Sequence, residues 1–141
     1  MRTLLLSILF VAGSVVAQTP ATPPAPVAIP AVPTVPPIKR TLLQKVDLGD
    51  REEIMAIAEI APGGAAGRHS HYGVETSYVL EGETMLEIDG EAPRLLKAGD
   101  SFSIPAGKIH DARTHGDKPV KVLAVYVVEK GKPLAVPAPA K

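Results

Sequence analysis

Residues 76–90 read Thr-Ser-Tyr-Val-Leu-Glu-Gly-Glu-Thr-Met-Leu-Glu-Ile-Asp-Gly, and this stretch decides the fold class. It contains two short apolar runs, 76–80 and 85–88, and each run is stopped by a pair of turn residues, Glu81-Gly82 and Asp89-Gly90. An Asp-Gly pair beside an apolar run is a strong signal for a tight β-hairpin turn. The stretch therefore predicts two short strands, each ended by a turn.

The same spacing continues on both sides of this stretch. Further short apolar runs bounded by Gly, Pro or Asp occur at 54–60, 95–96, 101–104, 109–114 and 120–129. Turn signals about every 8–12 residues are typical of an all-β sandwich or barrel. Since no stretch of the domain keeps a helical period, the domain is predicted to be all-β.

Composition excludes several classes of function. Of the 141 residues, 45% are hydrophobic and 21% charged, as in a globular protein. The segment 41–130 carries 10 basic and 15 acidic residues, a net charge of −5, which disfavours a basic groove for nucleic acid. The chain has no cysteine, which excludes disulfides, thiolate metal sites and a cysteine nucleophile.

The first 40 residues are predicted to be an export signal followed by a spacer. Residues 1–17 hold one Arg, an apolar run of 14 residues and small residues before Ala17, the pattern of a signal peptide cleaved after Ala17. The run is shorter than the ~20 residues of a membrane-spanning helix, so no stable anchor is expected after cleavage. Residues 18–40 are rich in Pro and Ala and predict a disordered, extended spacer. We expect an exported protein, periplasmic or secreted, with a domain at 41–130 and a flexible C-terminal tail at 131–141.

Three of the four histidines are placed where a metal site needs them. His69 and His71 are two residues apart, and Glu75 follows four residues later. On a strand, even offsets point side chains to one face, and His110 in the later strand could complete a set of three imidazoles and one carboxylate. Such a set suits a first-row transition metal better than calcium or magnesium. Taken alone, His-Ser-His could also be a polar loop after a glycine-rich turn.

The wider pattern resembles the cupin superfamily. Its first motif is a glycine, five residues, His-x-His, three or four residues, Glu, six residues and a glycine, found here at Gly63, His69, His71, Glu75 and Gly82. Its second motif is a glycine, five residues, Pro-x-Gly, two residues, His, three residues and Asn, found here at Gly99, Pro105, Gly107 and His110. Thr114 stands where the asparagine is expected, and the resemblance covers roughly residues 45–129.

The resemblance implies a small single-domain (type-2) cupin with a β-barrel of the double-stranded β-helix or jelly-roll kind. It also implies that one divalent transition-metal ion is bound by His69, His71, Glu75 and His110. Glu75 is in addition the candidate catalytic residue, as a ligand that moves protons when it detaches. The ligands alone do not choose between Fe, Mn, Ni, Co, Cu and Zn.

The function expected from the resemblance is a small-molecule metalloenzyme of the dioxygenase type. An isomerase or decarboxylase on the same fold is an alternative. Another is a periplasmic module that binds or senses a metal or small ligand without chemistry. The expected partners are a small molecule and a second copy of the chain in a homodimer, with no nucleic acid.

Four further residues complete the sequence-based expectations. Ser77 shares the parity of Glu75 and is a candidate for lining the pocket, as are Tyr78 and Thr114. Each could instead be an ordinary core or strand residue. His115 is expected to lie on the surface, because it has the opposite parity to His110.

Overall fold

The computed structural model describes residues 38–141, so the predicted signal peptide and nearly all of the predicted spacer lie outside the described residues. The described part forms ten strands and no helix: β1 (Lys39–Asp47), β2 (Arg51–Ile60), β3 (His69–Ser70), β4 (Gly73–Glu81), β5 (Glu83–Ile88), β6 (Arg94–Lys97), β7 (Ser101–Ile104), β8 (His110–Thr114), β9 (Val120–Glu129) and β10 (Val136–Pro137). The predicted all-β class is confirmed. Within 38–141 there is no helix long and apolar enough to cross a membrane.

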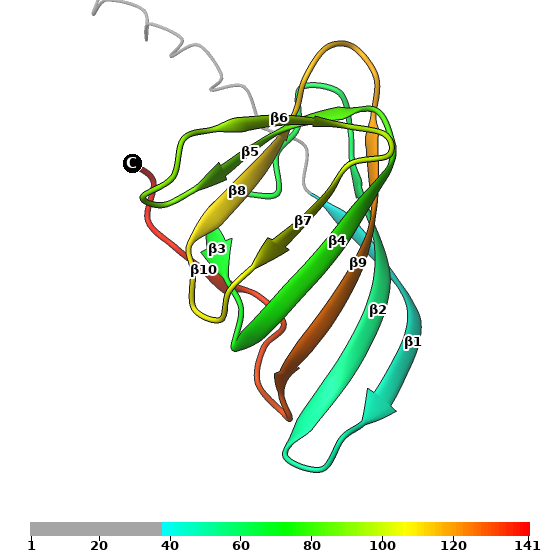
Figure 1. Cartoon of the computed structure of the whole chain (residues 1–141), viewed down its shortest axis with the longest axis vertical. Helices are drawn as coiled ribbons and strands as arrows, with labels where there is room; N and C mark the ends of the chain where they lie inside the picture. The colour runs from blue at the N-terminus through cyan, green and yellow to red at the C-terminus, as the bar shows by residue number, and fades with distance from the viewer. Residues whose placement is uncertain (1–37) are drawn as a thin grey trace, which may run out of the picture. The chain divides into compact units, whose positions relative to one another are not determined.

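The strands form two antiparallel sheets of five strands each (Figure 1). The first sheet has the order β1-β2-β9-β4-β7 and the second has the order β10-β3-β8-β5-β6. Between β4 and β9 the chain passes from the first sheet to the second and back twice. This winding is that of a double-stranded β-helix, or jelly roll, as expected.

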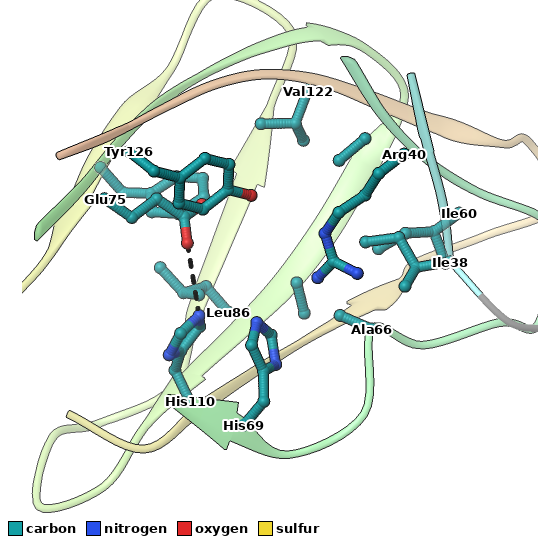
Figure 2. Close-up of a pocket in the computed structure, with 13 residues that line it drawn as sticks. Ile38, Arg40, Ile60, Ala66, His69, Glu75, Leu86, His110, Val122 and Tyr126 are labelled. Carbon is teal, nitrogen blue, oxygen red and sulfur yellow. Dashed lines mark ion pairs between the residues drawn. The ribbon is translucent and has the colours of Figure 1, made fainter. Parts of the chain in front are cut away.

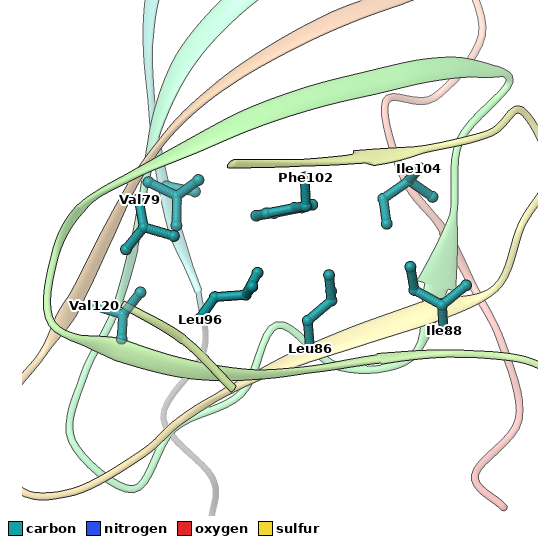
Figure 3. Packing of buried hydrophobic residues seen from close by; sticks show 9 residues of the cluster. Val79, Leu86, Ile88, Leu96, Phe102, Ile104 and Val120 are labelled. Atoms are coloured by element: carbon teal, nitrogen blue, oxygen red, sulfur yellow. The ribbon is translucent and has the colours of Figure 1, made fainter. Parts of the chain in front are cut away.

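The hydrophobic core fills the space between the two sheets. Strand β9 shows why, because its residues alternate between buried and partly exposed from Val120 to Val128. Inward side chains of both sheets form one buried cluster (Figure 3): Ala58, Val79, Leu86, Ile88, Leu96, Phe102, Ile104, Val120 and Val122. Burying each large aliphatic member stabilises the fold by roughly 1.5–3 kcal/mol, so this cluster is the rigid base beside which the polar site is built.

The turn between β4 and β5 requires a glycine. Gly82 has a φ of +78°, and a Cβ atom there would lie 2.3 Å from the carbonyl oxygen of Pro119. Both the backbone conformation and the lack of space exclude a side chain. The glycine of the first motif thus lets β4 and β5 pass into different sheets.

Strand β1 was not predicted from the sequence, and it begins two residues before the expected domain start. Its pairing with β2 shifts register between Leu42 and Gln44, so its apolar residues do not alternate. It is also an edge strand whose residues are mostly exposed. Both features remove the two-residue period by which a strand is recognised.

The C-terminal segment, expected to be a flexible tail, pairs with the second sheet. In β10, Val136 pairs with Ser70 and Pro137 pairs with His69. The N–H of Ala138 also donates to the carbonyl of Arg68, at 2.9 Å. These contacts are made by backbone groups. The composition of the segment, rich in Pro and Ala, therefore gave no indication of them. We refer to residues 131–141 as the C-terminal strap.

Candidate metal centre

Three histidines and one glutamate meet between the two sheets. His69 in β3 pairs directly with His110 in β8, and His71 is the first residue after β3. Glu75 reaches them from β4 in the opposite sheet. All four side chains are buried, and their ligand atoms lie within 4.8 Å of one another. The structure therefore brings together the four residues predicted to bind the metal ion (Figure 2 shows three of them).

Each of the three imidazole rings is oriented by a backbone carbonyl. The distances from Nδ1 to the carbonyl oxygen are 2.6 Å for His69 and Gly67, 2.5 Å for His71 and Leu134, and 3.0 Å for His110 and Lys108. A carbonyl oxygen can only accept a hydrogen bond, so Nδ1 is the protonated nitrogen in each ring. The Nε2 atoms are left with their lone pairs, which is the form that binds metals.

Gly67 has a particular part in this arrangement. Its φ is +79°, a conformation that side chains other than glycine rarely adopt. The turn at Gly67 leads the chain into β3, and its carbonyl accepts the proton of His69 Nδ1. The glycine-rich approach that the sequence indicated thus sets the tautomer of a ligand.

The donor set fits a cation. Nε2 of His71 lies 2.9 Å from Oε2 of Glu75, and Nε2 of His110 lies 3.5 Å from the same oxygen. With both Nδ1 atoms protonated, each of these pairs consists of two acceptors, and Nε2 of His71 has no hydrogen-bond partner. Buried acceptors that face one another are unfavourable unless a proton or a metal ion lies between them. Three nitrogens and one oxygen suit a first-row transition metal and leave coordination positions open.

Glu75 is held as an anion. Burial opposes its charge, but a proton carried between its carboxylate and Nε2 of His110 or His71, together with a hydrogen bond from Ser77, outweighs burial and lowers the pKa of Glu75 below its usual range. Ser77 Oγ donates to Oε1 at 2.6 Å, which leaves Oε2 directed at the histidines. Ser77 therefore orients the carboxylate ligand.

His69 is held in its neutral form. Burial lowers the pKa of His69 to about 4, and the neighbouring His110, His71 and Arg40 also disfavour a charge on it. The hydrogen bond to the carbonyl of Gly67 opposes this shift without cancelling it. At neutral pH the ring is thus ready to act as a ligand.

A small, mostly apolar cavity adjoins the cluster (Figure 2). It offers about 30 Å³ to water-sized molecules, which is room for a few waters or one small ligand. Its walls come from both sheets: Ile38, Arg40, Ala58, Ile60, Ala66, His69, Glu75, Leu86, Phe102, His110, Ala112, Val122 and Tyr126. A cavity of this kind suits a small, partly apolar molecule.

Tyr126 presents a neutral hydroxyl to this cavity. It is 2% exposed, and its ring centre lies 5.0 Å from that of His71. Burial, together with the nearby charge of Glu75, raises the pKa of Tyr126 to about 12. The phenol therefore stays protonated at neutral pH, so it can donate a hydrogen bond to a ligand.

The three residues predicted to line the pocket have different outcomes. Ser77 is outside the cavity lining and is corrected to a buried residue that donates a hydrogen bond to Glu75. Tyr78 is 47% exposed, because alternation along β4 turns it away from Glu75 and Ser77. Thr114 is outside the cavity lining, and both its Oγ1 and its N–H donate to the carbonyl of Gly64, at 3.2 and 3.1 Å. Tyr78 is thus corrected from a lining residue to a residue on the outer face of the sheet. Thr114 is corrected to a residue that braces a turn. His115 is exposed, as expected.

Sequence analysis missed Arg40 and the C-terminal strap. Arg40 lay in the predicted spacer, yet on β1 it pairs with buried Ala58, and inward neighbours share a face across a sheet. The strap supplies the carbonyl of Leu134 to His71. No side-chain pattern marks a backbone acceptor, so only the fold could show this contact.

The strap is fastened next to the metal centre by Arg68. Its guanidinium binds the carboxylate of Asp89 through two hydrogen bonds of 2.9 and 2.8 Å, and its Nε donates to the carbonyl of Pro139 at 2.8 Å. The hydrogen bonds from Arg68 and from Lys141 lower the pKa of Asp89 to about 2. This ion pair therefore ties the strap to the turn after β5.

Residues 56–126, half of the chain, match the family described as Cupin domain. The chain belongs to the cupin family. The motif positions His69, His71, Glu75 and His110 are the ones that form the site described above.

Relatives of this cupin have diverse names. It is 34% identical over 85 residues to "Polyketide synthase CurC" of Streptomyces cyaneus, covering 60% of this chain and 54% of that protein. It is 30% identical over 89 residues to "Oxalate-binding protein" of Thermotoga maritima, covering 62% and 72%. It is 34% identical over 71 residues to "Dimethylsulfoniopropionate lyase DddW" of Ruegeria pomeroyi, covering 50% and 46%. This cupin thus spans about half the length of CurC and of DddW.

Solved structures agree with the fold. A double-stranded β-helix protein from Klebsiella pneumoniae has a TM-score of 0.60 at 20% identity, covering 76% of this chain and 90% of that one. A cupin-like protein from Thermotoga maritima has a TM-score of 0.61 at 19% identity, covering 72% and 75%. At these identities the likeness establishes the fold alone.

Proposed function

We propose that this cupin is a small-molecule metalloenzyme of the dioxygenase type. The observation that carries the proposal is the convergence of three Nε2 lone pairs and one carboxylate oxygen within 4.8 Å, next to a cavity. A purely structural site would gain nothing from four buried acceptors without a donor between them. A divalent transition-metal ion bound there would supply Lewis acidity and, if it is redox-active, electron transfer to dioxygen at its open positions.

The chain's own residues perform three tasks in this function. The carbonyls of Gly67, Lys108 and Leu134 fix the ring orientations, so little reorganisation is needed during the reaction. Ser77 keeps Glu75 directed at the histidines. The lowered pKa of Glu75 makes it a weak base that stays available as an anionic metal ligand, whereas Tyr126 keeps its proton and can donate a hydrogen bond to a substrate.

The apolar walls of the cavity affect how strongly a bound substrate interacts with the polar residues of the site. Side chains such as Ile60, Leu86 and Val122 make the cavity that also contains His69 and His110 mostly apolar. In such surroundings the interactions of Glu75 and Tyr126 with a substrate are stronger than in water. The small volume restricts the substrate to a few heavy atoms.

A second candidate is a cupin that acts without dioxygen, either as a lyase or isomerase or by binding alone. The observation that favours it is the scarcity of acid–base groups in the cavity. Apart from the histidines and Arg40, the titratable residues of its lining are Glu75 and Tyr126. Relatives named as a lyase and as an oxalate-binding protein support the same alternative.

Elemental analysis of the purified protein tests the metal site first. We expect one transition-metal ion per chain in the wild type and in His115→Ala, whose histidine is exposed, and little metal in His110→Ala. Oxygen uptake with a panel of small metal-chelating molecules of a few heavy atoms then separates the two candidates. Uptake that depends on His110 supports the dioxygenase. Metal binding without uptake by any panel member favours the second candidate, and equal metal content in all three proteins contradicts the site.

A further inference from the structure

Arg40 brings a positive charge to the edge of the metal centre. It lies on β1 opposite Ala58, and Figure 2 shows its guanidinium turned toward His69 in the cavity. Of the thirteen lining residues it is the one with a permanent positive charge, and Glu75 is the one carboxylate. The proposed function assigns no task to it.

The charge of Arg40 lacks a partner within residues 38–141. The ion pairs of the described residues do not include it. Its Nε atom is buried and has no hydrogen-bond partner. The hydroxyl of Tyr126 is its polar neighbour in the cavity, and a phenol brings no negative charge. Burying part of a guanidinium without an anion is costly, so the site is incomplete as it stands.

Glu75 does not supply the missing charge. One of its oxygens accepts from Ser77 and the other faces His71 and His110. A metal ion bound by this carboxylate would use its negative charge and add further positive charge near Arg40. With a metal ion bound, the positive charges around the cavity would exceed the negative charges. An anionic group on the ligand would restore the balance.

The form of the guanidinium and the size of the cavity specify the anion. Arg presents a planar fork of N–H donors that matches a carboxylate with two parallel hydrogen bonds. About 30 Å³ is small, and most of the other lining side chains are aliphatic, including Ile38 and Ile60. A short carbon chain ending in a carboxylate satisfies the charge, the geometry and the apolar walls together.

We propose that Arg40 binds the carboxylate of a small carboxylic acid whose other end reaches the histidine cluster. Arg40 is then the residue that determines specificity, selecting organic acids over neutral molecules of the same size. This inference rests on the proposed function for the second contact of the ligand. The contact with Arg40 itself requires only the cavity.

Calorimetric titration with acetate, malonate and succinate tests the proposal, with acetamide as the neutral probe and inorganic phosphate as the tetrahedral anion. The proteins are the wild type, Arg40→Met, Arg40→Lys and Lys39→Met, each after metal loading and after chelator treatment. Lys39 is the matched control, because its side chain is 75% exposed and pairs with Glu59 on the surface. Circular dichroism verifies the fold of each variant, and Arg40→Lys provides a charged variant should Arg40→Met not fold.

We expect at least one carboxylate to bind the wild type and Lys39→Met, with affinity at least tenfold weaker in Arg40→Met and intermediate in Arg40→Lys. Metal content should be the same in all four. Equal carboxylate affinity in Arg40→Met and wild type, or equal binding of acetamide and acetate, would overturn the assignment. Phosphate binding as tight as any carboxylate would overturn the choice of carboxylate. Binding that depends on Arg40 in protein that takes up no metal would keep this inference and refute the proposed function.

Discussion

Nδ1 of His71 donates a hydrogen bond to the carbonyl of Leu134, 63 residues further along the chain. A metal ligand is thus oriented by the C-terminal strap. The strap is itself held by β10, by the contact of Ala138 with Arg68, and by packing of Leu134 against the cluster around Tyr126. The orientation of His71 therefore depends on a segment outside the residues 56–126 that match the cupin family.

Deleting residues 131–141 should weaken metal binding by about 10–100-fold, because His71 would lose the acceptor that sets its tautomer. Competition with a chelator of known affinity measures the change, and circular dichroism shows whether the sheets persist. Deleting only residues 140–141, which leaves Leu134 and Pro139 in place, should change affinity little. Equal affinity in the full chain and the longer deletion would refute the role of the strap.

Replacing Ser77 with Ala should weaken metal binding by about tenfold or more. The carboxylate of Glu75 would lose a buried charge-assisted hydrogen bond of 2.6 Å, and such bonds contribute about 1.5–3 kcal/mol. The pKa of Glu75 should also rise toward its usual value. Thr76→Ala is the control, because Thr76 is its exposed neighbour on the other face of β4. An unchanged metal affinity in Ser77→Ala would show that Glu75 is oriented without it.

Replacing Thr114 with Val should lower stability by about 1 kcal/mol and leave metal content and ligand affinity unchanged. The reason is that Thr114 Oγ1 donates to the carbonyl of Gly64 at 3.2 Å and does not line the cavity. Chemical denaturation and elemental analysis measure the two quantities. A loss of ligand binding at full stability would instead place Thr114 in the site.

Tyr126 should make the metal-free protein sensitive to high pH. The pKa of Tyr126 is about 12 in the folded state against 10.0 for an ordinary tyrosine, so the folded state holds the phenol proton more tightly. This stabilisation is complete below pH ~10 and is lost as the pH rises from about 10 to about 12, amounting to about 2–3 kcal/mol.

The difference between wild type and Tyr126→Phe isolates this effect, since the other groups that titrate at high pH are common to both proteins. Denaturant unfolding at pH values between 9 and 12, roughly the span of the two pKa values, provides the measurement. We expect the wild type to lose more stability than the variant over this interval. Parallel pH profiles would contradict the raised pKa.

The amino-acid sequence was sufficient to predict the strands that have a buried face. Strand β7, Ser-Phe-Ser-Ile, carries its alternation in the side chains, and turn residues such as Asp89-Gly90 mark where strands end. The four residues of the metal cluster were predicted by the resemblance of their spacing to the cupin motifs.

The sequence misled where side-chain periodicity was absent or ambiguous. Strand β1 lost its alternation at the irregularity beside Leu42, so Arg40 was taken for part of a spacer. Tyr78 was expected near the site because its hydroxyl could orient a substrate, yet the alternation of β4 turns it outward. For Arg40, only pairing with β2 decides which way the side chain points, whereas the parity of Tyr78, opposite to that of Glu75, already indicated the outer face.

The sequence by itself thus determined the strand periods, the turns and the residues able to bind a metal ion, because these are local properties of side chains. Tertiary structure alone decided which backbone carbonyls orient the histidines, that the C-terminal strap reaches His71, and that Arg40 enters the cavity. Backbone acceptors are the same at every residue, so a sequence cannot distinguish the carbonyl of Leu134 from any other. Only the winding of the two sheets brings it to within hydrogen-bonding distance of the metal centre.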